Sequence, residues 1–316
     1  MQEKQTYLVT GGAGFIGSHM VETLLKQGHS VRVVDNFSTG KRENLEPMKD
    51  QIELHEMSVT DLEPLKEVMQ GVDYVFHIAA LASVPRSVVD PIGSNDNNAN
   101  GTLNVLVAAR DAGVKRVMYA GSSSAYGNIE GEFKTEDMLP QPLSPYAVSK
   151  LTGEYYCQAF NSVYGLETVV VRYFNVFGPR QDPISPYAAV IPKFIAAMLD
   201  DHPPMVEGDG EQSRDFTYID NVVHGNLLAM HTPGVAGEVF NIACGGRVNL
   251  LDMINSLNKI MGKSLAPVHV APRPGDVKHS RAAIDKAQRM LGYEPVVSFD
   301  EGLARTLAWL EHNVPA

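Results

Sequence analysis

A tyrosine and a lysine stand four positions apart in the segment SPYAVSKLTGEYY, as Tyr146 and Lys150. In a helix this spacing places both side chains on one face, one turn apart. A free tyrosine has a pKa near ~10, and a neighbouring ammonium group stabilises its phenolate. The pattern therefore predicts that Tyr146 acts as a base near neutral pH and that Lys150 lowers its pKa.

Three consecutive serines, Ser122, Ser123 and Ser124, directly follow the strand-like run RVMYAG at residues 116–121. A parallel sheet carries its chemistry at the carboxyl ends of its strands. Serines after a strand are often simple loop residues, and Tyr-x-x-x-Lys alone is a common pattern. Their occurrence together, after a glycine-rich turn, favours a catalytic site.

That glycine-rich turn follows the first strand-like run, TYLVT, at residues 6–10. Gly11, Gly14 and Gly17 are spaced as GxxGxxG, and Gly12, Gly14 and Gly17 also fit GxGxxG. Without a Cβ, the backbone can turn sharply and approach a pyrophosphate, while the following helix supplies N–H donors. The sequence therefore predicts a dinucleotide site.

Asp35 ends the next strand-like run, SVRVVD, at residues 30–35. A carboxylate at this position can accept both hydrogen bonds of the adenosine ribose and would repel a 2′-phosphate. We therefore expect NAD as the cofactor and not NADP. As an alternative, Asp35 is only a turn residue of the segment DNFSTG.

Strand-like and helix-like segments alternate through the first half of the chain. Short Val- and Ile-rich runs separated by helices indicate a parallel sheet that is covered on both faces. The fold class that we predict is α/β, a doubly wound Rossmann sheet. The expected strands cover 6–10, 30–35, 51–57, 74–79, 116–121 and 167–174, and the expected helices cover 18–28, 62–71, 100–113 and 146–164.

The rhythm changes after about residue 178, where stretches rich in Pro and polar residues occupy 178–187 and 200–215. We expect an NAD-binding Rossmann domain at 1–178 and a smaller, mixed nucleotide-sugar-binding lobe at 179–316. One further buried strand, at 238–243, is expected to rejoin the first sheet.

The 316 residues carry a net charge of −11 with a pI near 5.4, which argues against a general nucleic-acid or membrane-surface binder. Two cysteines, Cys157 and Cys244, suggest neither a disulfide framework nor a metal site. The N-terminus does not read as a signal segment, and apolar runs are shorter than the ~20 residues that span a bilayer. We expect a soluble, cytoplasmic protein.

Eight motifs carry a resemblance that runs nearly from end to end of the chain. On them the sequence resembles the extended short-chain dehydrogenase/reductase family, and within it the UDP-sugar 4-epimerases. They are TGGAGFIGSH (10–19), DNFSTG (35–40), HIAA (77–80), SSSAYG (122–127), YAVSK (146–150), RYFNVFGPRQ (172–181), RDFTYIDN (214–221) and RPGDVKHS (273–280).

In such enzymes the tyrosine takes the proton of the sugar 4-hydroxyl while hydride passes to NAD. The 4-ketosugar then turns over in the pocket and receives the hydride on its other face. The resemblance implies that Tyr146 is the base and that Lys150 tunes it and binds the nicotinamide ribose. It also implies that Ser122 hydrogen-bonds the 4-oxygen, with Ser123 or Ser124 assisting.

The resemblance also implies binding residues. Relatives often carry Asp where Ser58 stands, and a planar guanidinium such as that of Arg214 or Arg273 can hold a diphosphate with two hydrogen bonds. The implied cofactor contacts are Gly11, Gly14, Phe15, Ile16, Gly17, Asp35, Asn36, Ser38, Thr39, Gly40, Ser58, Val59, Ala79, Ala80, Ala82, Asn98, Tyr146, Lys150, Tyr173 and Phe174, and the implied substrate contacts are Ser83, Ser122, Asn175, Ala189, Val190, Arg214, Arg273, Asp276 and Ser280.

Other chemistries of the same family need groups that this chain lacks. Dehydratases carry Asp-Glu where Ser123 and Ser124 stand, and the decarboxylases use a Glu near there. Relatives that act on UDP-glucuronate tend to have Thr and Arg where this chain has Asn175 and Asp182. A nucleotide-sugar reductase, or a noncatalytic dinucleotide sensor on the same fold, is the remaining alternative.

The expected sugar follows from three small residues. Ser280 stands where galactose-type enzymes often carry Tyr, and Ala82 and Ala189 replace larger polar residues. Because all three changes enlarge the pocket, we expect UDP-GlcNAc and UDP-GalNAc as substrates, with UDP-glucose and UDP-galactose as the alternative.

We also expect a homodimer. In the family that the chain resembles, the helices at 100–113 and 146–164 pair across a two-fold axis. The apolar residues expected in that contact are Leu103, Leu106, Leu151 and Tyr155.

Overall fold

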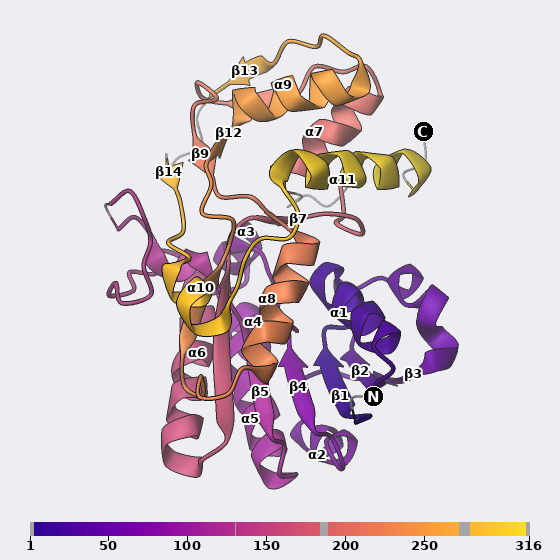
Figure 1. The fold of residues 1–316 in the computed structure, drawn as a ribbon, viewed down its shortest axis with the longest axis vertical. Helices are drawn as coiled ribbons and strands as arrows, with labels where there is room; N and C mark the ends of the chain where they lie inside the picture. The colour runs from indigo at the N-terminus through magenta and orange to yellow at the C-terminus, as the bar shows by residue number, and fades with distance from the viewer. Residues whose placement is uncertain (1–2, 130, 184–188, 272–278, 314–316) are drawn as a thin grey trace.

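A seven-stranded parallel sheet forms the centre of the molecule (Figure 1). The computed structural model describes residues 3–129, 131–183, 189–271 and 279–313. The strand order is β11-β6-β5-β4-β1-β2-β3, and every neighbouring pair is parallel. The order reverses next to β1, which is the position where doubly wound sheets bind ligands. The predicted fold class is confirmed.

The strands begin and end within two residues of the positions expected from the sequence. The strand at the β11 edge comes from the second half of the chain and pairs with β6. The bounds are β1 Thr6–Thr10, β2 Ser30–Asp35, β3 Ile52–Glu56, β4 Tyr74–His77, β5 Arg116–Ser122, β6 Glu167–Tyr173 and β11 Val239–Ile242.

Helices cover both faces of the sheet, so each strand alternates between two hydrophobic clusters. Along β6, Val169 and Val171 belong to the cluster beneath α1 (Phe15–Lys26) and α8 (Ile219–His231). Val170 belongs to the opposite cluster, together with residues of α2 (Leu62–Val68), α5 (Gly101–Asp111) and α6 (Pro145–Tyr164).

The local sequence defines both ends of helix α6, which carries Tyr146 and Lys150. The side chain of Ser144 accepts a hydrogen bond from the Ala147 N–H at 3.1 Å, and Pro145 occupies the first helical position. Gly165 ends the helix in the left-handed conformation with φ 71°. Tyr146 therefore lies in the first turn, at the end of the helix nearest the carboxyl ends of the strands.

A chain of short helices leads from β4 to α5. It comprises α3 (Val84–Val89), α4 (Pro91–Asn95) and one turn of π-helix at Asp96–Asn100. Such π-helical turns are rare and often occur at functional sites.

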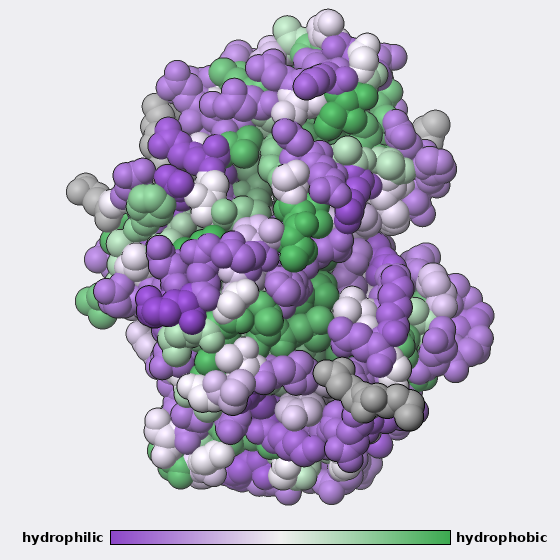
Figure 2. Space-filling view, viewed as in Figure 1, coloured by the Kyte–Doolittle hydropathy of each residue, from purple (hydrophilic) through white to green (hydrophobic). Residues whose placement is uncertain are grey.

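The C-terminal part lies above the sheet in Figure 1 and shares a hydrophobic cluster with it. In Figure 2, apolar residues gather in the middle of the face shown, where the two parts meet. Its helices are α7 Val190–Leu199, α9 Leu250–Met261, α10 Asp285–Leu291 and α11 Phe299–Asn313, and its small sheets join β9 Ser213–Arg214 to β12 Val248–Asn249 and β14 His279–Ser280, β7 Val176–Phe177 to β10 Thr217–Tyr218, and β8 Met205–Glu207 to β13 Val268–Val270.

We expected four apolar residues of α5 and α6 to be available at the surface for a dimer contact. That prediction is wrong for two of them. Leu106 is fully buried and Leu151 is 8% exposed, because both pack inside the chain's own core. Leu103 is partly buried against the same cluster, and Tyr155 is half exposed. Within the described ranges, no helix combines the length and apolar character needed to cross a membrane.

Candidate active site

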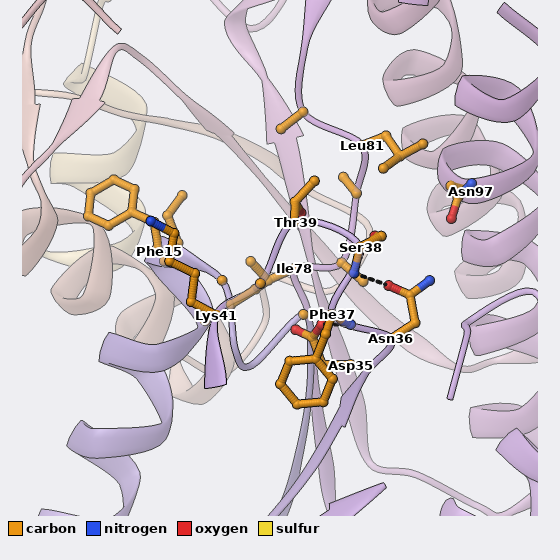
Figure 3. Close-up of a pocket in the computed structure, with 18 of the residues that line it drawn as sticks. Phe15, Asp35, Asn36, Phe37, Ser38, Thr39, Lys41, Ile78, Leu81 and Asn97 are labelled. Atoms are coloured by element: carbon orange, nitrogen blue, oxygen red, sulfur yellow. Dashed lines mark hydrogen bonds between the residues drawn. The ribbon is translucent and has the colours of Figure 1, made fainter. Parts of the chain in front are cut away.

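A cavity of about 720 Å³ opens at the carboxyl ends of β1, β2 and β4 (Figure 3). Most of the expected cofactor contacts line it. These are Gly11, Gly14, Phe15, Ile16, Gly17, Asp35, Asn36, Ser38, Thr39, Gly40, Val59, Ala79, Ala80 and Ala82.

The glycine turn at one wall of this cavity tolerates no side chains. Gly11 has φ +70°, and a Cβ there would lie 2.8 Å from the backbone of Ala79. A Cβ at Gly17 would collide with the carbonyl oxygen of Gly11. Helix α1 starts after Gly14 and has no side-chain cap, so its first N–H groups are free to bind an anion.

Asp35 links this turn to the end of β2. Its two carboxylate oxygens accept hydrogen bonds from the backbone N–H groups of Ala13, at 2.9 Å, and Phe37, at 2.8 Å. Burial raises the pKa of Asp35, and these two hydrogen bonds lower it. Each oxygen keeps a second lone pair that can accept from a ribose hydroxyl. The glycine cradle, the helix end and this carboxylate together fit NAD.

The serine triplet and Tyr146 meet next to the end of β5. The Ser122 Oγ accepts hydrogen bonds from the Ser124 Oγ, at 2.8 Å, and from the Ser124 N–H, at 3.2 Å. Burial raises the pKa of Tyr146, and a hydrogen bond with Ser122 lowers it. Ser123 is partly buried in the 3₁₀ turn Ser123–Tyr126. The Ser122 hydroxyl therefore lies close enough to the Tyr146 side chain to affect its pKa.

Lys150 lies one helical turn further along α6 and is 3% exposed. Its Nζ stands 4.3 Å above the ring centroid of Tyr119. Burial lowers the pKa of Lys150 to about 7. The lowering of the Tyr146 pKa by Lys150 stays a prediction, because Ser122 is the group that lowers it in this structure.

The expected substrate residues come from several segments. Ser83 and Ala189 line the cavity, and Val190 directly follows as the first residue of α7. Arg214 and Ser280 pair with each other where β9 meets β14. Arg273 and Asp276 lie outside the described residues.

Asn175 is hydrogen-bonded to the residue that follows Arg214. It adopts φ 35°, and its Nδ2 donates to the carbonyl oxygen of Asp215 at 3.1 Å. Asp215 is fully buried, and its carboxylate accepts hydrogen bonds from the backbone N–H groups of Cys244 and Ala282. Burial raises the pKa of Asp215 to about 6.

Some expected contacts do not line this cavity. The Ser58 Oγ accepts from both the N–H and the hydroxyl of Thr60, whereas the adjacent Val59 does line the cavity. The Tyr173 hydroxyl donates to the Asn226 Oδ1 at 3.0 Å, and Phe174 is fully buried. Asn98 is 1% exposed and bonds to other protein groups. Tyr146 and Lys150 do not line the cavity either. The cofactor contacts of these two residues and of Ser58, Asn98, Tyr173 and Phe174 stay predictions.

Other residues of the wall escaped the motif analysis. Lys41 and Asp182 form an ion pair at 3.3 Å, and both line the cavity. Asp182, which stands where relatives that act on UDP-glucuronate tend to have Arg, thus lies at the cofactor cavity. Only the position of Lys41 after the segment DNFSTG could have indicated its place. The further lining residues not expected from the sequence are Val34, Phe37, Met57, Ile78, Leu81, Arg86, Asn97 and Gln181.

Metal ligands are not grouped in the described part of the chain, where no cluster of three His, Cys, Asp or Glu side chains could hold an ion.

Known proteins are similar to this chain in sequence and fold over nearly its whole length. A UDP-glucose 4-epimerase from Thermotoga maritima, solved with UDP-glucose, is 40% identical with a TM-score of 0.92 and covers 97% of this chain and 99% of its own. A UDP-N-acetylglucosamine 4-epimerase from Methanobrevibacter ruminantium M1, in complex with UDP-N-acetylmuramic acid, is 38% identical with a TM-score of 0.94, covering 98% and 99%.

A third solved relative holds a dinucleotide. A UDP-glucuronic acid 4-epimerase from Bacillus cereus, in complex with UDP-glucuronic acid and NAD, is 35% identical with a TM-score of 0.90 and covers 97% of this chain and 99% of its own. The family model described as "NAD dependent epimerase/dehydratase family" matches residues 7–243. With this match and these end-to-end similarities, the chain belongs to the NAD dependent epimerase/dehydratase family.

Proposed function

We propose that the protein catalyses the reversible 4-epimerisation of a UDP-hexose with NAD as a bound cofactor. The observation that carries the proposal is the glycine-lined dinucleotide cavity at the carboxyl end of β1, with Ser122 at the end of β5 and Tyr146 in the first turn of α6. The solved relatives named above are 4-epimerases of UDP-sugars, which supports the same reaction.

NAD, when bound, supplies the acceptor and later the donor of the hydride at the sugar C4. Tyr146 removes the proton of the 4-hydroxyl and returns it after the sugar has turned over. Ser122 hydrogen-bonds the same oxygen, so the proton moves within a fixed geometry. Lys150, one turn further along α6, supplies positive charge that stabilises the phenolate.

We propose UDP-GlcNAc and UDP-GalNAc as the preferred pair. Ala82 and Ala189 line the cavity with small side chains, and Ser280 stands beside Arg214 in the neighbouring ladder. The Methanobrevibacter relative is named for the N-acetylated sugar, whereas the Thermotoga relative is named for UDP-glucose. UDP-glucose and UDP-galactose are therefore the second candidate pair.

The decisive experiment incubates the purified protein with UDP-GlcNAc and with UDP-glucose separately and resolves the products by NMR. We expect the 4-epimer of at least one sugar without consumption of added NADH. Stoichiometric NADH consumption would instead identify a nucleotide-sugar reductase. A protein that converts neither sugar and holds no dinucleotide would match the noncatalytic alternative.

We also propose a homodimer and a two-part organisation. The division into an NAD-binding domain at 1–178 and a substrate lobe at 179–316 is supported by the position of the main sheet, which contains six strands of the first range and β11 of the second. The homodimer is supported by exposed apolar side chains on neighbouring helices. These are Val88, Val89 and Ile92 on α3 and α4, and Val148 and Tyr155 on α6.

A further inference from the structure

A buried line of hydrogen bonds runs through His77 beneath the dinucleotide cavity. Thr10 and His77 are register partners at the ends of β1 and β4, and the Thr10 Oγ1 lies 2.7 Å from the His77 Nδ1. The His77 Nε2 lies 2.9 Å from the Thr102 Oγ1. Thr102 in turn donates to the carbonyl oxygen of Asn98 at 2.5 Å. All four residues are at most 1% exposed, so water does not compete for these bonds.

The direction of each bond follows from its two ends. A carbonyl oxygen only accepts, so the Thr102 hydroxyl proton goes to Asn98 and the His77 Nε2 must donate to Thr102. At the other end, the Thr10 Oγ1 accepts from the Ala79 N–H at 3.2 Å and can donate its proton to the His77 Nδ1. His77 is then a neutral imidazole with its proton on Nε2.

The surroundings of His77 favour this neutral form. Burial lowers its pKa to about 3, and the nearby charge of Lys150 contributes in the same direction. The ring of Tyr119 lies 5.6 Å from that of His77, and the Tyr119 hydroxyl donates to the backbone of Lys150. The imidazole therefore holds one tautomer and does not act as an acid or base.

The network ends at the catalytic helix. The Asn98 Oδ1 accepts from the Leu81 N–H at 2.8 Å, and its Nδ2 donates to the Ser149 Oγ at 3.0 Å. Ser149 donates to the carbonyl oxygen of Tyr146 at 2.8 Å. The π-helical turn that contains Asn98 thus joins the loop after β4 to the first turn of α6.

We propose that His77 is a positioning residue for the reaction proposed above. Its fixed tautomer links the end of β1 to the π-helical turn through hydrogen bonds with Thr10 and Thr102. The hydrogen bonds from Asn98 to Ser149 and from Ser149 to the carbonyl oxygen of Tyr146 then fix the backbone of Tyr146 relative to that turn. The inference rests on the proposed function, since it concerns where the base stands relative to the cofactor cavity. No member of the line from Thr10 to Asn98 needs to touch the sugar.

The test compares Thr102→Val with Thr102→Ser. Valine keeps the shape of threonine but leaves the His77 Nε2 without an acceptor and removes the side-chain bond to the Asn98 carbonyl, whereas serine keeps the hydroxyl. We expect Thr102→Val to lower kcat roughly ten- to a hundredfold, because small displacements of a reacting group are costly, with KM changed less than about twofold. Thr102→Ser should stay within about threefold of wild type in both constants.

Two kinetic outcomes would overturn the proposal. A folded Thr102→Val enzyme with the wild-type kcat would show that the line does not position Tyr146. Equal losses in the valine and serine variants would show that the hydroxyl is irrelevant. Thermal unfolding of both variants establishes that they are folded.

A second measurement does not depend on activity. Nitrogen NMR of histidine-labelled wild-type protein, with His77→Gln to assign the signal, reports the protonated nitrogen. We expect a neutral imidazole with its proton on Nε2 throughout roughly pH 5 to 8. A titrating His77 or a proton on Nδ1 would refute the network even in an active enzyme. Conversely, an inactive wild-type protein with this tautomer would refute the proposed function and leave the hydrogen-bond network established.

Discussion

Tyr146 is the residue whose chemistry is most directly testable. Tyr146→Phe removes the hydroxyl but keeps the ring, so the packing of the first turn of α6 is preserved. Because a general base contributes about 10²–10⁴-fold, we expect kcat to fall by that amount while UDP-sugar binding stays nearly unchanged. NMR of product formation gives kcat, and calorimetry gives the Kd. Activity within a factor of a few of wild type would rule out Tyr146 as the base.

Ser280 tests the choice of sugar. If its side chain lies beside the C2 substituent, Ser280→Tyr fills the space of the N-acetyl group, and overpacking costs about 1–3 kcal/mol. The ratio of kcat/KM for UDP-GlcNAc over UDP-glucose should then fall by about one to two powers of ten. Ser280→Ala, which keeps the site open, is the control. An unchanged ratio would remove the main support for an acetylated sugar.

At the level of single residues, motif spacing predicted the glycine wall and Asp35 because their roles depend on neighbours close in sequence. The ion pair between Lys41 and Asp182 was not predicted because it joins segments about 140 positions apart and depends on tertiary structure. For Asn98 the cofactor contact that the resemblance implies stays a prediction, and the structure adds bonds of its side chain to Leu81 and Ser149. The π-helical turn that directs it has no local sequence signal.

At the level of elements, Asp35 connects β2 to the start of α1 and should control cofactor retention. Asp35→Ala leaves the N–H groups of Ala13 and Phe37 without acceptors and removes a ribose partner. Since epimerisation has no net redox change, wild-type protein should co-purify with NAD, and the variant should carry much less. Dinucleotide released on denaturation measures this. Asp50→Ala, at an exposed position, is the matched control, and equal NAD contents in both variants would contradict the role.

Strand and helix positions were predictable because their periodicity reflects burial on one or two faces. The strands of the sheet are nearly continuous in Val and Ile, and they alternate between two covered faces as that pattern requires. The failure at Leu106 and Leu151 has a physical cause, since a helix packed on a sheet and on neighbouring helices buries more than one stripe. A sequence does not show which of its apolar stripes faces the chain's own core.

The stability of the whole molecule should fall on mild acidification. Burial lowers the pKa of His19 to about 4 and that of His77 to about 3. Below about pH 6.5 the unfolded chain therefore binds more protons at these histidines than the folded protein does. The free energy of unfolding then decreases as the pH falls, by up to about 1.4 kcal/mol per pH unit for each histidine. Burial raises the pKa of Asp215 to about 6 in the folded protein. Between that value and its lower pKa in the unfolded chain, Asp215 increases the free energy of unfolding as the pH falls, which offsets part of the loss.

Urea unfolding at several pH values between about 7 and 5 measures this dependence. His19→Gln keeps a donor for the carbonyl oxygen of Pro179, which the His19 Nε2 contacts at 3.0 Å, but it does not titrate. Its free energy of unfolding should therefore depend less steeply on pH than that of wild type. Stability that is constant or rises on acidification over this range would contradict the assignment of buried, neutral histidines.

The exposed apolar side chains of α3, α4 and α6 lead to the last prediction, which concerns assembly. Val89 and Ile92 are 81% and 74% exposed, and they lie next to α6, on which Tyr155 is half exposed. Such an apolar patch is unfavourable in water unless a partner covers it. A two-fold contact would bury the same patch on both copies. We expect light scattering at micromolar concentration to give twice the 34.4 kDa mass of the chain. Val89→Asp with Ile92→Asp should yield a monomer, because closing the contact would bury four unpaired carboxylates. Val296→Asp, at another exposed apolar position (57% exposed), should leave the dimer intact. A wild-type monomer would refute the dimer and leave the site within each chain unaffected.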